Sequence, residues 1–208
     1  MFKNLLKPDS SLMITMTWIT DCIFLSLFWI MGCIPVVTVG ASFAALYDAT
    51  YRACRQGEKN SWQRFLQVYR VNWKASIAPT VIFLAVAYGL AKALIGLWNG
   101  AATGALSWMV FSGGAFVVVL VLGMLSILFP MLSRFENPLA ALLKNTLLIG
   151  SAHLPRTIAL GMVNGVSAFL CVRFVFPLFF LPAVAALIGS LFIEPMFKPY
   201  MPEEEAAE

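Results

Sequence analysis

Long apolar runs, separated by short polar breaks, make up most of this chain. Five of the runs supply the roughly 20 mostly apolar residues that a membrane-spanning helix needs. They cover residues 12–39, 75–98, 106–132, 157–175 and 176–197. A shorter helical segment over 41–54 follows the turn at Pro35–Gly40, and it crosses if that turn lies within the bilayer. The pattern therefore predicts about six transmembrane helices.

After the 41–54 segment the pattern changes to that of an amphipathic helix. Its apolar stripe falls at helical spacing on Trp62, Phe65, Leu66, Tyr69 and Trp73. The residues off that stripe are Gln63, Arg64, Gln67, Arg70 and Lys74. Such a stripe is typical of a helix in the membrane interface, and a stripe packed on the protein itself is an equally good interpretation. A second short helix, over 139–151, is predicted to be interfacial or re-entrant because it is too short to span.

The composition favours a membrane protein. Of the 208 residues, 61% are hydrophobic and 12% are charged, whereas a soluble domain carries about 25% charged residues. A core of this size could not hide so much apolar surface from water. We therefore predict an all-α, polytopic membrane helical bundle in the lipid bilayer. A single transmembrane domain over residues 1–198 precedes an acidic tail over 199–208, which is predicted to be disordered.

The positive charges predict an orientation. The net charge is +4, and with six crossings and both termini cytoplasmic, 12 of the 14 basic residues lie inside, as the positive-inside rule requires. These residues are Lys3, Lys7, Arg52, Arg55, Lys59, Arg64, Arg70, Lys74, Arg134, Lys144, Arg156 and Lys198. Since basic residues stand between apolar runs rather than on a soluble face, nucleic-acid binding is not expected.

Four ionisable residues within the predicted spans are candidates for function: Asp21, Asp48, Lys92 and Arg173. A charge at membrane depth is unfavourable by several kcal/mol unless it is paired or hydrated. A pair of Asp48 with Lys92 or Arg173 could line a polar cavity or a proton path. The favoured interpretation is that Asp21 and Asp48 form hydrogen bonds within the bundle and fix its packing.

Glycines in the run over 106–132 predict a close contact between helices. Gly113, Gly114 and Gly123 carry no side chain, so a neighbouring helix can approach their backbone closely. That neighbour belongs either to this chain or, at Gly113 and Gly114, to a second copy in a self-oligomer.

No arrangement of catalytic or metal-binding residues stands out. Cys22, Cys33, Cys54 and Cys171 form no CxxC pair, and we expect them to be small packing residues. His153 is the single histidine, and the motifs HExxH, GxSxG and the phosphate-binding loop are absent. The chain is therefore predicted not to be an enzyme and to use no cofactor and no metal.

Several short motifs resemble one family of membrane proteins. They are the turn Pro35–Gly40, Ala45-Leu46-Tyr47, Arg55–Glu58, Phe65, Tyr69-Arg70, Asn72-Trp73-Lys74 and His153–Arg156. Over nearly the whole chain, this pattern resembles the YesL family of bacterial integral membrane proteins, a family of unknown molecular function. The resemblance implies a bacterial plasma membrane and a link to carbohydrate utilisation, often alongside sugar importers. It supplies no catalytic residues.

Two functions remain open. The first is a non-enzymatic accessory or regulatory subunit linked to carbohydrate uptake, which binds the permease or ATPase subunits of an importer through its cytoplasmic surface. The docking candidates on that surface are Arg55, Arg64, Arg70, Trp73, Lys74 and Arg156. The alternative is a small autonomous transporter or channel that uses the four intramembrane residues.

Overall fold

The structure is a computed structural model that describes residues 11–58, 60–104, 108–135 and 138–200. Within these ranges the chain forms eight α-helices, with short 3-10 and π-helical turns and no strand. The helices are α1 (Ser11–Cys33), α2 (Val39–Tyr51), α3 (Ser61–Asn72), α4 (Ile77–Ala102), α5 (Trp108–Arg134), α6 (Leu139–Ala152), α7 (Leu154–Arg173) and α8 (Leu181–Phe197). The predicted all-α class is confirmed. The acidic segment 201–208 lies outside the described residues.

Five helices are long and apolar enough to cross a membrane. They contain the spans Met16–Cys33, Ile77–Ala102, Trp108–Arg134, Leu154–Arg173 and Leu181–Tyr200. The sequence predicted six, and the difference is α2, which has 13 residues. An apolar helix of that length is more typical of a buried core helix than of a span. Ten of the 13 residues of α2 are indeed buried.

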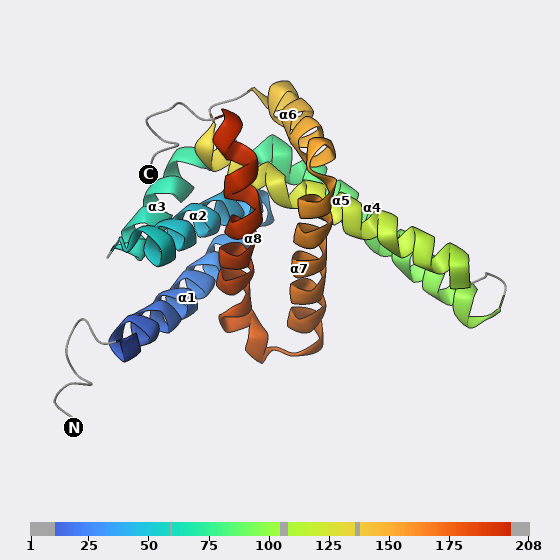
Figure 1. Ribbon diagram of the computed structural model, residues 1–208, viewed down its shortest axis with the longest axis horizontal. Helices are drawn as coiled ribbons and strands as arrows, with labels where there is room; N and C mark the ends of the chain where they lie inside the picture. The colour runs from blue at the N-terminus through green and yellow to red at the C-terminus, as the bar shows by residue number, and fades with distance from the viewer. Residues whose placement is uncertain (1–10, 59, 105–107, 136–137, 201–208) are drawn as a thin grey trace.

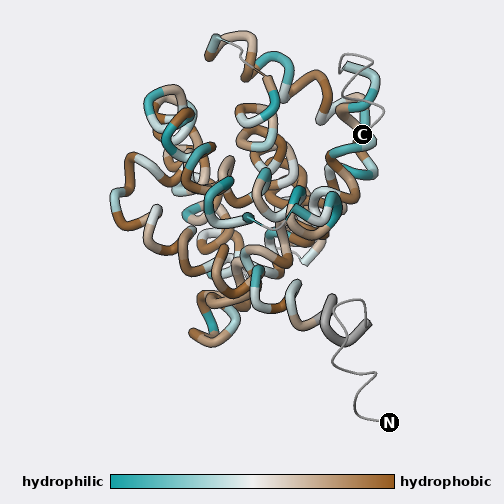
Figure 2. Tube along the Cα trace, turned by 90° about the vertical axis from the view of Figure 1, so that its left-hand side faces the viewer, coloured by the Kyte–Doolittle hydropathy of each residue, from teal (hydrophilic) through white to brown (hydrophobic). Residues whose placement is uncertain are grey.

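The helices diverge from a common centre (Figure 1). The α4–α5 hairpin extends to one side, the α7–α8 hairpin extends downward, and α1 points to a third side. Hydrophobic residues recur along the outer helices as well as at the centre (Figure 2). Only 6% of the α4 span is buried within the protein, so these arms present apolar surface outward, as helices in lipid do.

The first three helices pack side by side. Pro35 has no backbone N–H to continue α1, and the chain turns back so that α2 runs antiparallel to α1. Cys22 lies beside Cys54, and Gly32 lies beside Ser42. The third helix then runs in the direction of α1, because Ser61 at its start contacts Asp21.

The amphipathic segment predicted over residues 62–74 is α3. Phe65 and Val68 are buried, and the rings of Phe65 and Phe28 on α1 lie 5.9 Å apart. Trp62 and Trp73, at the two ends of the predicted stripe, are exposed. The middle of the stripe is therefore packed on the protein, which is the second of the two interpretations given by the sequence.

Glycine contacts hold α5 against α7. A Cβ atom on Gly123 would overlap the carbonyl oxygen of Thr157, and one on Gly161 would overlap that of Val119. The close approach predicted at Gly123 is confirmed. Gly113, farther out on the same helix, has no atom within 4 Å of such a Cβ.

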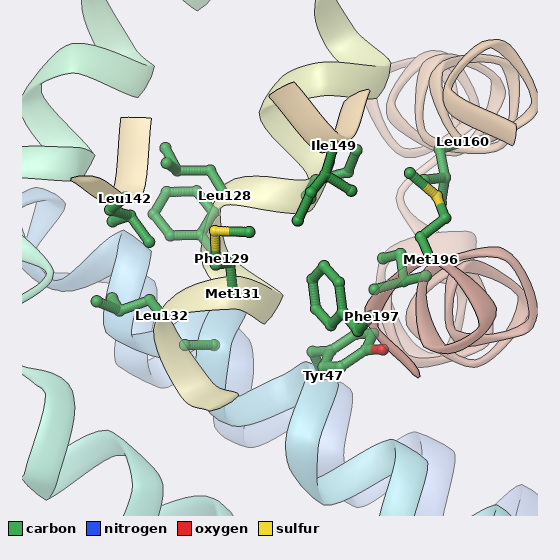
Figure 3. Close-up of a cluster of buried hydrophobic side chains, with 13 residues drawn as sticks. Tyr47, Leu128, Phe129, Met131, Leu132, Leu142, Ile149, Leu160, Met196 and Phe197 are labelled. Carbon is green, nitrogen blue, oxygen red and sulfur yellow. The ribbon is translucent and has the colours of Figure 1, made fainter. Parts of the chain in front are cut away.

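The main apolar core lies where α5 meets α2, α6, α7 and α8 (Figure 3). Leu128, Met131 and Leu132 of α5 contribute to it, together with Leu142 of α6 and Phe197 of α8. The inner half of α5 is thus buried, whereas its outer half is exposed. This core surrounds the charged groups that are described next.

Candidate functional site

Asp48 is the centre of a buried ionic cluster. Its side chain is 1% exposed, and both of its carboxylate oxygens are occupied. The Nε of Arg64 donates to Oδ2 at 2.6 Å, and the Nε of Arg52 donates to Oδ1 at 3.4 Å. Arg52 stands one helical turn after Asp48, whereas Arg64 comes from α3. The pair with Arg64 therefore ties α3 to α2.

A second buried cluster joins three helices. Glu194 of α8 accepts a hydrogen bond from Nη2 of Arg134, the last residue of α5, and another from the hydroxyl of Tyr47 on α2, both at 2.9 Å. The Arg134 guanidinium also lies 4.8 Å from the ring centre of Tyr51. The side chains of Arg134 and Glu194 are 11% and 8% exposed.

These two clusters form one continuous band, because α2 contributes neighbouring residues to both. We call it the polar band, and its members are Tyr47, Asp48, Tyr51, Arg52, Arg64, Arg134 and Glu194. Each of its two acids is matched by at least one arginine. Paired charges avoid most of the penalty of burial. The band therefore has the chemistry of a clamp between α2, α3, α5 and α8.

The sequence analysis missed Glu194, Arg134 and Tyr47. Glu194 stands within the last apolar run, and the criterion that selected Asp48 applies to it equally. Arg134 was treated as a loop residue because it ends a run. Tyr47 carried no signal beyond its place in a family motif, since a tyrosine hydroxyl is a common neutral group.

The four intramembrane candidates are not brought together. Asp21 accepts a hydrogen bond from the Oγ of Ser61 at 2.9 Å. Lys92 and Arg173 are exposed, and each lies over the ring of a neighbouring residue in its own segment, Tyr88 and Phe174. The partners of Asp48 are Arg52 and Arg64 rather than Lys92 or Arg173.

The docking candidates separate into two groups. Arg55, Arg70, Trp73 and Lys74 are exposed. Arg64 and Arg156 are half-buried, and Arg64 is engaged by Asp48. The sequence had placed Arg64 on the outer face of α3, but the pairing turns it inward. The remaining group is concentrated around the end of α3.

A cavity of about 240 Å³ lies between the inner parts of α2, α5, α7 and α8. Its walls are mainly apolar and include the polar residues Ser126, Asn164 and Ser167. Each of the three donates a hydrogen bond to a carbonyl of its own helix. None of the described residues that line the cavity is charged, so Asp21, Asp48, Lys92 and Arg173 do not contribute to it.

Among the residues that the structure describes, no group of three or more His, Cys, Asp or Glu side chains could hold a metal ion. The chemistry available in the polar band is hydrogen bonding and charge pairing by arginine, carboxylate and phenol groups.

Comparison with known proteins identifies one similarity. Residues 22–91 match a family model described as "Protein of unknown function, DUF624". The DUF624 match runs from within α1, through α2 and α3, into α4. It therefore contains Asp48, Arg52 and Arg64, whereas Arg134 and Glu194 lie beyond it. No curated protein and no solved structure matches the chain.

Proposed function

We propose that this chain is a non-enzymatic accessory or regulatory membrane subunit linked to carbohydrate uptake in a bacterial plasma membrane. The observation that carries the proposal is the anchored α3, which packs one face on the bundle and presents an aromatic and basic surface outward. The link to carbohydrate rests on the resemblance of the sequence to the YesL family.

Two contacts anchor α3. Phe65 is 2% exposed and packs against α1, while Arg64 reaches into the bundle to the buried Asp48. A surface held in place before binding loses less conformational freedom when a partner arrives. Anchoring is therefore what a docking surface requires.

The outward face of α3 and the residues after it have the composition of a binding site. Val71 and Trp73 are 70% and 45% exposed, and Arg70 and Lys74 lie beside them. The ammonium of Lys74 lies 5.4 Å from the ring centre of Trp73. Aromatic and arginine side chains are the residues most often found at the centre of protein interfaces. We call Arg70, Val71, Trp73 and Lys74 the α3 docking surface, and its partner in this proposal is a permease or ATPase subunit of an importer.

The proposed orientation has both termini in the cytoplasm. It requires the helix from Val39 through the π-helical turn Arg52–Gln56 to act as a sixth crossing. An accessibility tag inserted after the exposed Gly57 tests this orientation. Labelling from the cytoplasmic side alone is expected, and labelling from outside alone would reject it.

The alternative, an autonomous transporter, was motivated by the four intramembrane charges. Its support is weaker because Asp21 and Asp48 are engaged by Ser61 and by arginines, and the cavity has an uncharged lining. The variant Asp48→Asn separates the two functions. A docking subunit loses mainly stability, whereas purified protein in liposomes would lose a measurable sugar, ion or proton flux if Asp48 were on its path.

The proposal is tested with the full-length protein, tagged in its native membrane and crosslinked mildly before purification. Mass spectrometry is expected to identify the permease or ATPase subunits of a carbohydrate importer. The triple variant Arg70→Ala, Trp73→Ala and Lys74→Ala should lose at least tenfold of that recovery. The matched control is Gln63→Ala and Gln67→Ala, which alters exposed residues of the same helix outside the docking surface.

Two results would reject the proposal. One is recovery of the protein alone or only as a self-oligomer. The other is recovery of importer subunits at the same level with the triple variant. Deleting the gene should also reduce the rate of uptake of at least one carbohydrate, and unchanged uptake of all those tested would remove the link to carbohydrate.

A further inference from the structure

Two cysteines from distant parts of the chain lie against each other. Cys22 is on α1, and Cys54 is on the π-helical turn Arg52–Gln56 that continues α2. Their thiols are hydrogen-bonded to each other. Both side chains are buried in one apolar cluster with Leu25 and Phe65. The sequence treated these cysteines as packing residues, because nothing in the pattern shows which of them meet.

We propose that Cys22 and Cys54 form an oxidisable dithiol that closes to an intramolecular disulfide when it reacts with a peroxide. The reaction takes place in two steps. One thiol is first oxidised by hydrogen peroxide to a sulfenic acid, with release of one water. The second thiol then attacks the sulfenic sulfur, the S–S bond forms, and the oxygen leaves as a second water. In total, two thiols and one peroxide give one disulfide and two waters.

The environment assigns different roles to the two sulfurs. The hydrogen bond with Cys22, together with burial, raises the pKa of the Cys54 thiol. Cys54 therefore keeps its proton while Cys22 meets the oxidant. Because the resolving thiol is already in contact, the sulfenic acid is captured within the molecule before a second peroxide oxidises it further.

The local backbone allows the bond to form. A disulfide needs the two sulfurs about 2 Å apart, so the hydrogen-bonded thiols must move closer together. Cys54 stands in a π-helical turn, a wide and uncommon form that often marks functional sites. The turn ends at Gly57, which has a φ of 69° and takes the left-handed conformation without strain. A small shift of this turn toward α1 closes the bond.

The bond would join two segments that flank the start of α3. Asp21, next to Cys22, accepts the hydrogen bond from Ser61, the first residue of α3. A covalent link between Cys22 and Cys54 therefore fixes the position from which α3 emerges. In a reducing compartment the dithiol is the resting form and the disulfide is the transient, oxidised one.

The test uses the full-length protein in native membranes, treated with increasing hydrogen peroxide and then quenched. After denaturation, N-ethylmaleimide labels the remaining thiols, and mass spectrometry counts the labels and maps the peptides. Cys22 and Cys54 should lose their labels together, in a peptide pair joined by a disulfide, and dithiothreitol should restore both labels. A variant with Cys33→Ser and Cys171→Ser should behave in the same way, because it keeps the pair.

Glutathione in the same mixture reports whether the peroxide dose is sufficient. The proposal is rejected if Cys22 and Cys54 remain labelled at doses that oxidise glutathione. It is also rejected if they are oxidised separately to sulfinic acids, or if Cys22→Ser leaves Cys54 equally protected from N-ethylmaleimide after oxidation. The wild-type measurement needs no substitution, so a variant that fails to fold does not prevent a decision.

Discussion

The second helix and the outer part of the α4–α5 hairpin differ in a way that reverses the usual order of a soluble protein. Ten of the 13 residues of α2 are buried, and they include the charged Asp48. Only 6% of the α4 span is buried, although it is one of the most apolar segments of the chain. In water, the charged helix would be outside and the apolar hairpin inside. The comparison shows that the structure suits apolar surroundings, with its ionic groups paired within the bundle.

The two regions are also held together by different means. In α2, small residues such as Gly40, Ala44 and Ala45 let the neighbouring helices approach, and the polar band then links them by charge. The outer hairpin is held by ring contacts among Trp98, Trp108 and Phe111. Substitutions in the first region should therefore change stability much more than substitutions in the second.

The largest effect is expected for Glu194→Ala. The substitution leaves the buried Arg134 without its carboxylate partner and removes the acceptor of the Tyr47 hydroxyl. Breaking a buried ion pair in this way destabilises a protein by about 3–5 kcal/mol. The free energy of unfolding in detergent micelles, measured with increasing denaturant, checks this. Glu194→Gln, which keeps an acceptor, should lose less, and a stable Glu194→Ala protein would mean that the polar band is not a clamp.

A charge on the outer hairpin should act on membrane insertion instead of packing. Val117 on α5 is 57% exposed, so Val117→Asp removes little packing within the protein. If this surface faces lipid, the apparent free energy of insertion of α5 should become less favourable by about 2–3 kcal/mol. A glycosylation-mapping assay of the inserted helix measures it, with Val117→Leu as the control. Equal insertion of the two variants would argue against lipid around the hairpin.

The glycines of α5 allow both regions to be compared on one helix. Gly123→Ala places a methyl group against the Thr157 carbonyl and forces α5 and α7 apart, which should destabilise the protein by about 1–3 kcal/mol. Gly113→Ala meets no atom within 4 Å and should be neutral or slightly stabilising, since alanine favours the helix. Thermal unfolding of both variants in the same detergent decides this. Equal losses would show that the two halves of α5 do not differ.

The smallest change in stability is expected on the α3 docking surface. Trp73 is 45% exposed, so Trp73→Ala should change the free energy of unfolding by no more than about 0.5 kcal/mol. The same denaturant titration measures it. A loss comparable to that of Glu194→Ala would show that Trp73 is part of the folded core, and the surface would no longer be free for a partner.

The sequence predicted the elements better than their contacts. Apolar runs located the five long helices, and the stripe on Phe65 located α3. The pairing of Asp48 with Arg64 could not be predicted, because hydropathy does not report how each helix is rotated about its axis. The close approach at Gly123 was predicted, but its partner Gly161 was not, for the same reason. The candidate functional residues remain predictions.

The central claim is that the charges inside this bundle hold its helices together. A double-mutant cycle between Arg134→Met and Glu194→Met tests it most directly, because the two side chains lie 2.9 Å apart on different helices. The free energy of unfolding is measured for the wild type, both single variants and the double variant in the same detergent. We expect the double variant to be more stable than the sum of the single losses implies, with a coupling of about 1–3 kcal/mol. Losses that simply add would contradict the claim.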